Sequence, residues 1–192
     1  MTDSFLKEGI ISDEDKEIVR FGLESMEGNL QGIGLTLVVG ICFNRVGEAL
    51  LLWLLLFPLR KNAGGYHAAT KKRCLFMSVV MLIIAFIVFG VYEHMLVFYG
   101  ICVVIAGCVI WFLAPIANPS KELDAVEYKV YRRRTRIALG VETAIFVLAL
   151  SIEWEMAVRS ICMTFFIVCV SLLIGVAKYT ISNKFRERDR KF

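Results

Sequence analysis

Four long apolar runs dominate this sequence and limit the folds that the chain can adopt. The runs cover residues 75–91, 95–114, 137–152 and 156–177. Each is close to the roughly 20 residues that an α-helix needs to cross the hydrocarbon core of a bilayer. None alternates apolar and polar residues, as the strands of a membrane β-barrel do. We therefore expect an all-α, polytopic membrane protein with four clear transmembrane helices.

The first 28 residues differ in character from the rest of the chain. Residues 1–27 contain eight acidic side chains, without the apolar stretch and small-residue cleavage site of a signal peptide. Within residues 4–27, apolar side chains form a rough helical stripe among the charges. This pattern predicts an N-terminal amphipathic helix that lies either in the membrane interface or against the rest of the protein. We take residues 1–28 as this segment and residues 29–192 as one helical membrane domain.

Residues 30–57 form an apolar segment with a polar interruption. Arg45 and Glu48 lie within it, and a charge at bilayer depth costs about 2.5 kcal/mol or more on insertion scales. The two residues are three apart, so they share one helix face. This spacing predicts a mutual salt bridge inside the bundle or, alternatively, a polar cavity. The segment is compatible with one long span or two half-depth helices, and a single crossing would place the N-terminus outside.

Basic residues are concentrated in three regions of the chain. These regions are residues 58–73, residues 115–136 and the tail after residue 178, whereas the connections at 92–94 and 153–155 carry acidic side chains and His94. The positive-inside rule places the three basic regions in the cytoplasm. The net charge of +4 therefore reflects membrane topology, with the lipid bilayer and not nucleic acid as partner.

Of the six cysteines, Cys74 alone borders polar, charged sequence. The other five lie in apolar stretches, where we expect small buried residues: Cys42, Cys102, Cys108, Cys162 and Cys169. The chain has no CxxC pair and only two histidines, so the sequence predicts no structural zinc site. We expect no metal and no cofactor.

The segment around His67 and Cys74 is polar, glycine-rich and placed between two apolar segments. Thr70 is an N-cap candidate for the helix that follows, so Cys74 would lie near its first turn. A helix N-terminus and nearby cations stabilise a thiolate. In a continuous helix His67 and Cys74 would be about 10 Å apart. Proton transfer needs roughly 2.6–3.2 Å, so the Gly64-Gly65 pair must break the helix and return His67.

The spacing of His67 and Cys74 does not by itself establish catalysis. A cysteine beside basic residues at the membrane edge is also an ordinary palmitoylation pattern. The basic side chains have two interpretations as well, because they can bind the carboxylates of a substrate or set topology and meet anionic lipid headgroups. This applies to Lys71, Lys72, Arg73, Arg132, Arg133 and Arg134.

Arg60, the sequence Ala63-Gly64-Gly65-Tyr66-His67-Ala68, Thr70 and Cys74 together resemble the motif of the accessory gene regulator B (AgrB) family. These are integral-membrane cysteine endopeptidases that process quorum-sensing propeptides in Gram-positive bacteria. The likeness extends to the chain length, the apolar runs and the basic loop near 115–136. It implies catalytic roles for His67 and Cys74, and supporting, oxyanion-binding or substrate-positioning roles for Arg60, Gly64 and Gly65. No third member of a catalytic triad is identifiable.

The resemblance also implies a reaction and a partner. Cys74 would cleave the C-terminal tail from an AgrD-like propeptide through an acyl-thioester, and a Cys or Ser of the peptide would close a thiolactone or lactone ring. The propeptide would carry an amphipathic leader and an acidic tail, and a homodimer fits a small bundle of this kind. Two other readings remain: a small transporter or permease subunit whose path is lined by Arg45, Glu48 and Glu142, and a non-catalytic membrane scaffold acylated on Cys74.

Overall fold

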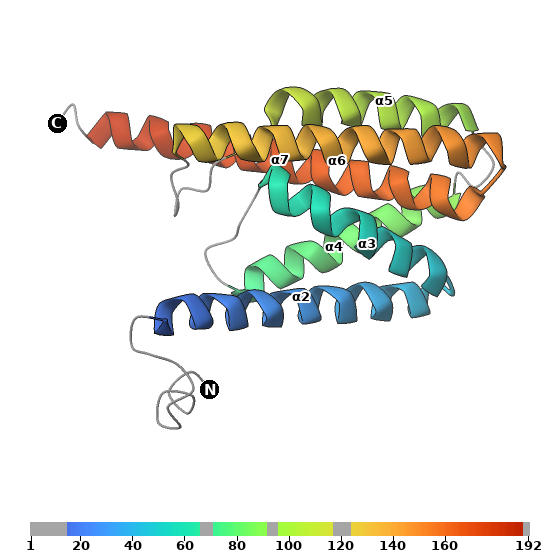
Figure 1. Cartoon of the computed structure of the whole chain (residues 1–192), viewed down its shortest axis with the longest axis horizontal. Helices are drawn as coiled ribbons and strands as arrows, with labels where there is room; N and C mark the ends of the chain where they lie inside the picture. The colour runs from blue at the N-terminus through green and yellow to red at the C-terminus, as the bar shows by residue number, and fades with distance from the viewer. Residues whose placement is uncertain (1–14, 66–70, 92–95, 117–123, 190–192) are drawn as a thin grey trace.

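The protein is a bundle of α-helices (Figure 1). The computed structural model describes residues 15–65, 71–91, 96–116 and 124–189. Their helices are α2 Lys16–Cys42, α3 Val46–Ala63, α4 Lys71–Val91, α5 Leu96–Leu113, α6 Ala125–Ser151 and α7 Glu155–Asp189. Within these ranges the only β-type pairing is an isolated bridge between Gly64 and Ile116. The predicted all-α class is confirmed.

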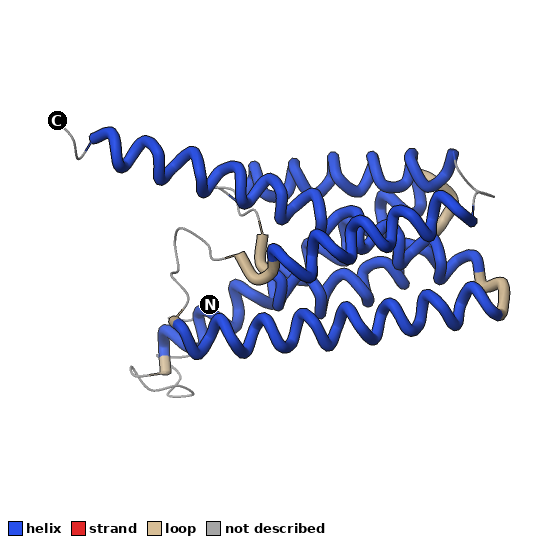
Figure 2. The backbone as a smooth tube through the Cα atoms, turned by 90° about the horizontal axis from the view of Figure 1, so that it is seen from above, coloured by secondary structure: helices blue, strands red, loops and turns tan. Residues whose placement is uncertain are grey.

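The helices run alternately in opposite directions, so their ends gather at two ends of the bundle (Figures 1 and 2). At one end α2 begins, α3 and α5 end, α4 and α6 begin, and α7 ends. We call this the basic end, because residues 60–61, 71–73 and 129–136 carry its Lys and Arg side chains. The opposite end carries the turns at 43–45 and 152–154. The described parts of the three regions that the positive-inside rule groups together therefore lie at one end of the fold.

The polar-interrupted segment is a helical hairpin. Its helices, α2 and α3, are joined by residues 43–45, where Asn44 has a φ of 57°. Asn tolerates this left-handed conformation better than most residues, and the amide of Arg45 donates to the carbonyl of Gly40 at 2.7 Å. The segment therefore contributes to two helices and not to one long span, but the expected half depth is wrong. At a rise of 1.5 Å per residue, α2 with its 27 residues is about 40 Å long and α3 with its 18 residues is about 27 Å long.

The described part of the N-terminal segment is the beginning of α2. This helix continues through residue 28 without a break, so the predicted boundary between residues 28 and 29 falls inside a helix. The remainder of the predicted amphipathic helix, residues 4–14, lies outside the described residues. The division into a separate segment and a membrane domain stays a prediction.

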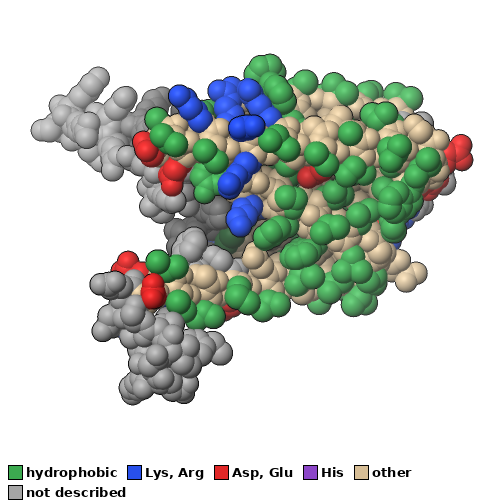
Figure 3. Space-filling view, viewed as in Figure 1, with side chains coloured by type: hydrophobic (Ala, Val, Ile, Leu, Met, Phe, Trp, Pro, Cys, Tyr) green, Lys and Arg blue, Asp and Glu red, His purple; other side chains and the backbone are tan. Residues whose placement is uncertain are grey.

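Helix α7 lies at the centre of the packing and contacts α3, α4, α5 and α6. Its fully buried side chains, such as Ile161 and Phe165, meet Leu52 of α3, Phe89 of α4 and Ile110 of α5 in one core. Many apolar side chains are also exposed on the face that Figure 3 shows. Large exposed apolar side chains on several helices are typical of a surface that faces lipid or a partner.

Two helices are long and apolar enough to cross a membrane, over Lys72–Gly90 and Glu155–Lys178. The apolar part of α5, Val97–Leu113, is shorter, and the first half of α6 is rich in Arg. Two of the four predicted transmembrane helices thus meet this criterion within the described residues. The other two predicted transmembrane helices correspond to α5 and to the second half of α6, which belong to the same bundle.

The cysteines in the apolar stretches are less buried than predicted. Cys162 is buried, Cys102 and Cys169 are intermediate, and Cys42 and Cys108 are exposed. The prediction was wrong for the last two, because an apolar helix on the outside of a bundle has an outward face that is as apolar as its inward face.

Candidate active site

Cys74 lies in the first turn of α4, as the sequence predicts. The helix begins at Lys71, and Cys74 has a free, partly buried thiol. The first amides of a helix have no partner within it, and their dipoles favour negative charge. Two cationic neighbours, Lys72 and Arg73, have exposed side chains. The position of Cys74 therefore combines access, helix dipole and nearby positive charge.

Arg60 is the residue that links α3 to Cys74. It lies in the last turn of α3 and is partly buried. Burial lowers the pKa of its guanidinium, and interaction with a negatively charged Cys74 acts in the opposite direction. The side chain keeps its positive charge, because an arginine is not deprotonated in proteins. The two helices thus bring a permanent cation within electrostatic reach of the candidate nucleophile.

The predicted break of the helix before His67 is present. Helix α3 ends at Ala63, and the amide of Gly64 donates to the carbonyl of Arg60 at 3.2 Å. Gly64 has a φ of 69° and Gly65 a φ of 121°. Other residues rarely adopt such angles, so both positions require glycine. His67 and Thr70 themselves lie outside the described residues, and the contact of His67 with Cys74 stays a prediction.

Two distant segments hold the Gly64-Gly65 turn. The amide of Ile116, which follows α5, donates to the carbonyl of Ala63 at 3.2 Å. On the other side, a Cβ placed on Gly65 would lie 2.6 Å from Oγ of Ser171 on α7. No local sequence pattern marks Ile116 or Ser171, because these residues meet the turn only in the folded chain.

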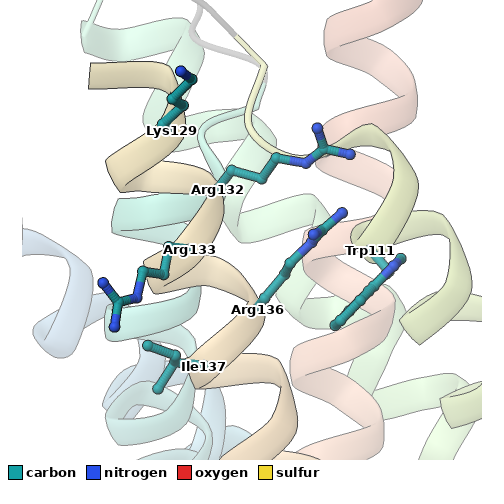
Figure 4. A pocket seen from close by; sticks show the side chains of 6 residues that line it. All are labelled: Trp111, Lys129, Arg132, Arg133, Arg136 and Ile137. Carbon is teal, nitrogen blue, oxygen red and sulfur yellow. The ribbon is translucent and has the colours of Figure 1, made fainter. Parts of the chain in front are cut away.

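The two predicted basic groups lie at different places of the basic end. Lys71, Lys72 and Arg73 belong to α4, whose start lies beside α2, whereas the start of α6 is on the other side of the molecule (Figure 1). On α6, Arg132 and Arg133 line a pocket with Trp111 (Figure 4). Arg134 is exposed and lies outside this pocket. Only the α4 group is adjacent to Cys74.

The predicted salt bridge between Arg45 and Glu48 is confirmed, at 3.2 Å. The buried Glu48 also pairs with Arg159 of α7, at 2.7 Å, a partner that the sequence did not indicate. Glu142, the third residue of the predicted transport path, is buried in α6, and its carboxylate oxygens have no hydrogen-bond partner in the described part of the chain. Among the described residues, no group of three or more His, Cys, Asp and Glu side chains could hold a metal ion.

Comparison with known proteins gives a consistent result. The model of the family described as accessory gene regulator B matches residues 1–182. Two Clostridium perfringens proteins, named only for their likeness to AgrB, are similar to the chain over 176 residues, with 85% of this chain and 78% of each relative covered. The protein of strain SM101 is 27% identical and that of strain 13 is 26% identical. No solved structure gives a significant match.

Proposed function

The chain belongs to the accessory gene regulator B family, and on this premise we propose that it is a membrane cysteine endopeptidase that processes a quorum-sensing propeptide. Cys74 is the nucleophile of this reaction and His67 is its general base. The observation that carries the proposal is the position of Cys74 in the first turn of α4, within electrostatic reach of Arg60.

This position supports two parts of the chemistry. The thiolate is the reactive form of a cysteine, and a helix start with a nearby cation such as Arg60 is a suitable environment for a thiolate nucleophile. The first amides of α4, which have no acceptor within the helix, or the amide of Gly65, are suited to donate to the oxyanion that forms when a peptide carbonyl is attacked. Both effects come from rigid elements, because Arg60 is on α3 and Cys74 on α4.

The Gly64-Gly65 turn supports the role of His67. The turn ends α3 and is packed between Ile116 and Ser171, so the chain leaves it in a defined direction only two residues before His67. A general base must approach its proton to hydrogen-bond distance, roughly 2.6–3.2 Å. We propose that the residues after the turn bring the His67 imidazole to the start of α4.

The reaction proceeds in two steps. The Cys74 thiolate attacks the carbonyl carbon of the scissile bond, and the tetrahedral intermediate collapses with expulsion of the tail amine, which takes its proton from the His67 imidazolium. An acyl-thioester remains on Cys74. A thiol or hydroxyl of the peptide, deprotonated by His67, then attacks the thioester carbonyl, closes the ring and releases the Cys74 thiolate. Water must be excluded while the thioester exists, because hydrolysis would waste it.

The proposed substrate has an amphipathic leader that lies on the membrane and an acidic tail. Lys71, Lys72 and Arg73, next to Cys74, are suited to bind the carboxylates of this tail. In a multi-pass orientation with the basic end inside, the site faces the cytoplasm, where the propeptide is made. A homodimer would double this site without changing its chemistry.

The proposal is tested by co-expression with a propeptide of this type, followed by mass spectrometry of the products. Cys74→Ala and His67→Ala should each abolish processing, and an acyl-enzyme should be trapped only on a chain that retains Cys74. The matched control is Cys42→Ala, an exposed cysteine at the opposite end of the bundle, which should process normally. Full processing by Cys74→Ala would refute the peptidase mechanism and favour the transporter or scaffold reading.

A further inference from the structure

A pocket of about 340 Å³ lies between α5 and the start of α6. Its lining has one aromatic residue of α5, four cationic residues of α6 and one aliphatic residue of α6: Trp111, Lys129, Arg132, Arg133, Arg136 and Ile137. In Figure 4 the side chains of Arg132 and Arg136 extend from α6 toward α5, and that of Arg136 lies beside the Trp111 ring. The pocket is separate from the Cys74 site, which is built on α3 and α4.

Arg132 and Arg136 have hydrogen-bonding capacity that the described residues do not use. The Nε atom of each is buried and has no hydrogen-bond partner. The guanidinium of Arg136 lies 4.3 Å from the centroid of the Trp111 ring, a stacking contact that orients its N–H groups without occupying them. Buried charged donors without acceptors are costly. An anion in this pocket would remove that cost, and the planar forks of two arginines suit the oxygens of a phosphate.

The surroundings of the pocket distinguish a lipid from a soluble anion. Phe112, next to Trp111, is 74% exposed, and Ile137 at the edge of the pocket is 56% exposed. Both are large apolar side chains on outer faces of the bundle. Trp is enriched at the level of the headgroups, where one side of its ring is apolar and its N–H is polar. A phosphate between the arginines would therefore have apolar surface beside it for acyl chains.

We propose that this pocket binds the phosphate headgroup of an anionic membrane lipid. The α6 basic residues then serve to anchor and orient the basic end in the inner leaflet, and the proposed contacts with substrate are left to the basic residues of α4. The position supports this division, because the starts of α4 and α6 lie apart (Figure 1). The inference rests on the proposed membrane placement but not on catalysis by Cys74.

The test uses Trp111 as a reporter of bound lipid. The full chain with Trp53→Phe and Trp154→Phe, which leaves Trp111 as its single tryptophan, is reconstituted in phosphatidylcholine nanodiscs. Phosphatidylglycerol with brominated acyl chains is then titrated in, and quenching of Trp111 is compared with that by brominated phosphatidylcholine. We expect preferential, saturable quenching by the anionic lipid. Equal quenching by both lipids would overturn the proposal.

Matched variants locate the binding. Arg132→Gln with Arg136→Gln should weaken the preference for phosphatidylglycerol about tenfold or more, as the loss of charge-assisted hydrogen bonds implies. Arg134→Gln removes an adjacent charge that is outside the pocket and should keep the preference. Circular dichroism and thermal unfolding confirm that each variant is folded. Equal weakening by both variants would show attraction to general positive charge and would overturn a specific pocket.

Two further arms distinguish other sources of negative charge. Millimolar inorganic phosphate, added to nanodiscs that hold the brominated phosphatidylglycerol, should leave the quenching of Trp111 in place; recovery of the fluorescence would assign the pocket to a soluble anion. An acidic peptide that displaces the brominated lipid in competition would assign it to the substrate tail. Cys74→Ala should retain the lipid preference, so failure of the lipid test and failure of the peptidase test are separate results.

Discussion

Gly65, the second residue of the turn after α3, is in direct contact with Ser171 in the middle of α7. A Cβ on Gly65 would lie 2.6 Å from Oγ and 3.4 Å from the carbonyl oxygen of Ser171. The φ of 121° at Gly65 also excludes other residues from this conformation without strain. The turn that precedes His67 is thus positioned by the central helix of the bundle.

Gly65→Ala should displace this turn and disrupt the proposed site. A left-handed φ costs on the order of 1–3 kcal/mol for a residue with a Cβ, and overpacking against Ser171 adds a similar amount. We expect a lower thermal unfolding temperature and at least a tenfold loss of propeptide processing. The control is Gly90→Ala in α4, where a Cβ meets nothing within 4 Å; it should be neutral or slightly stabilising. Normal processing by Gly65→Ala would contradict the importance of the turn.

Arg159→Met should destabilise the fold without changing the chemistry at Cys74. Arg159 pairs with the buried Glu48 at 2.7 Å, and removal of one partner of a buried ion pair costs about 3–5 kcal/mol. Arg45 also pairs with Glu48, so the low end of this range is expected. Thermal unfolding in detergent measures the effect, and processing per folded molecule should stay normal, because the pair lies at the end of the bundle opposite to Cys74.

Glu155→Gln is the matched control for this ion pair. Its carboxylate also pairs with Arg159, at 3.2 Å, but its side chain is 59% exposed. An exposed pair contributes only about 0–1 kcal/mol, so the unfolding temperature should barely change. A decrease in unfolding temperature equal to that of Arg159→Met would mean that the burial of Glu48 does not dominate the stability of this ion-pair cluster.

Glu142→Leu should stabilise the protein. Glu142 is 3% exposed, and both of its carboxylate oxygens are buried without a hydrogen-bond partner. Leu fills a similar volume, and removal of an unsatisfied buried polar group returns roughly 1–3 kcal/mol. Thermal unfolding should show a higher unfolding temperature for Glu142→Leu. For Glu153→Gln, in an exposed turn, the free energy of unfolding should stay within about 0.5 kcal/mol of that of the parent. A destabilised Glu142→Leu would reveal a partner or a path at this position.

Hydropathy located the apolar parts of α4, α5 and α7 but neither the polar start of α6 nor the polar end of α7. The runs at 75–91, 95–114 and 156–177 match the apolar parts of α4, α5 and α7. Helix α6 begins at Ala125, twelve residues before its apolar run at 137–152, because Asp124 and Glu127 form a capping box ahead of an Arg-rich first half. The start of a helix in polar sequence is indicated by its capping residues and not by hydropathy.

The site was predictable only as far as its residues are close in sequence. The position of Cys74 followed from a local signal, the junction of a basic loop and an apolar run. The break after Ala63 followed from the Gly-Gly pair. Ser171, which contacts the Gly65 turn, is more than 100 residues from Gly65 in the sequence, and no periodic pattern connects the two. The same holds outside the site for Arg159 and Glu48. Tertiary packing alone selects them.

Cysteine labelling tests the orientation that the hairpin of α2 and α3 implies. Because α2 begins at the same end of the bundle as Cys74, an N-terminal probe and Cys74 should be on one side of the membrane. Three single-cysteine variants serve as probes. One retains only the native Cys74, and the other two carry Glu17→Cys or Glu153→Cys in a chain whose six native cysteines are replaced. Glu17 and Glu153 are both exposed, so a maleimide can reach either position without disturbing the core.

A membrane-impermeant maleimide should modify Glu153→Cys in intact cells, and Cys74 and Glu17→Cys only in inverted vesicles. This outcome follows if the basic end is cytoplasmic, since Lys and Arg next to membrane helices are retained on that side. A single crossing by residues 30–57 would instead make Glu17→Cys react together with Glu153→Cys. Labelling of Cys74 from outside would indicate the opposite orientation of the bundle in the membrane. The proposed site would then face outward, where a propeptide made in the cytoplasm could not reach it before crossing the membrane.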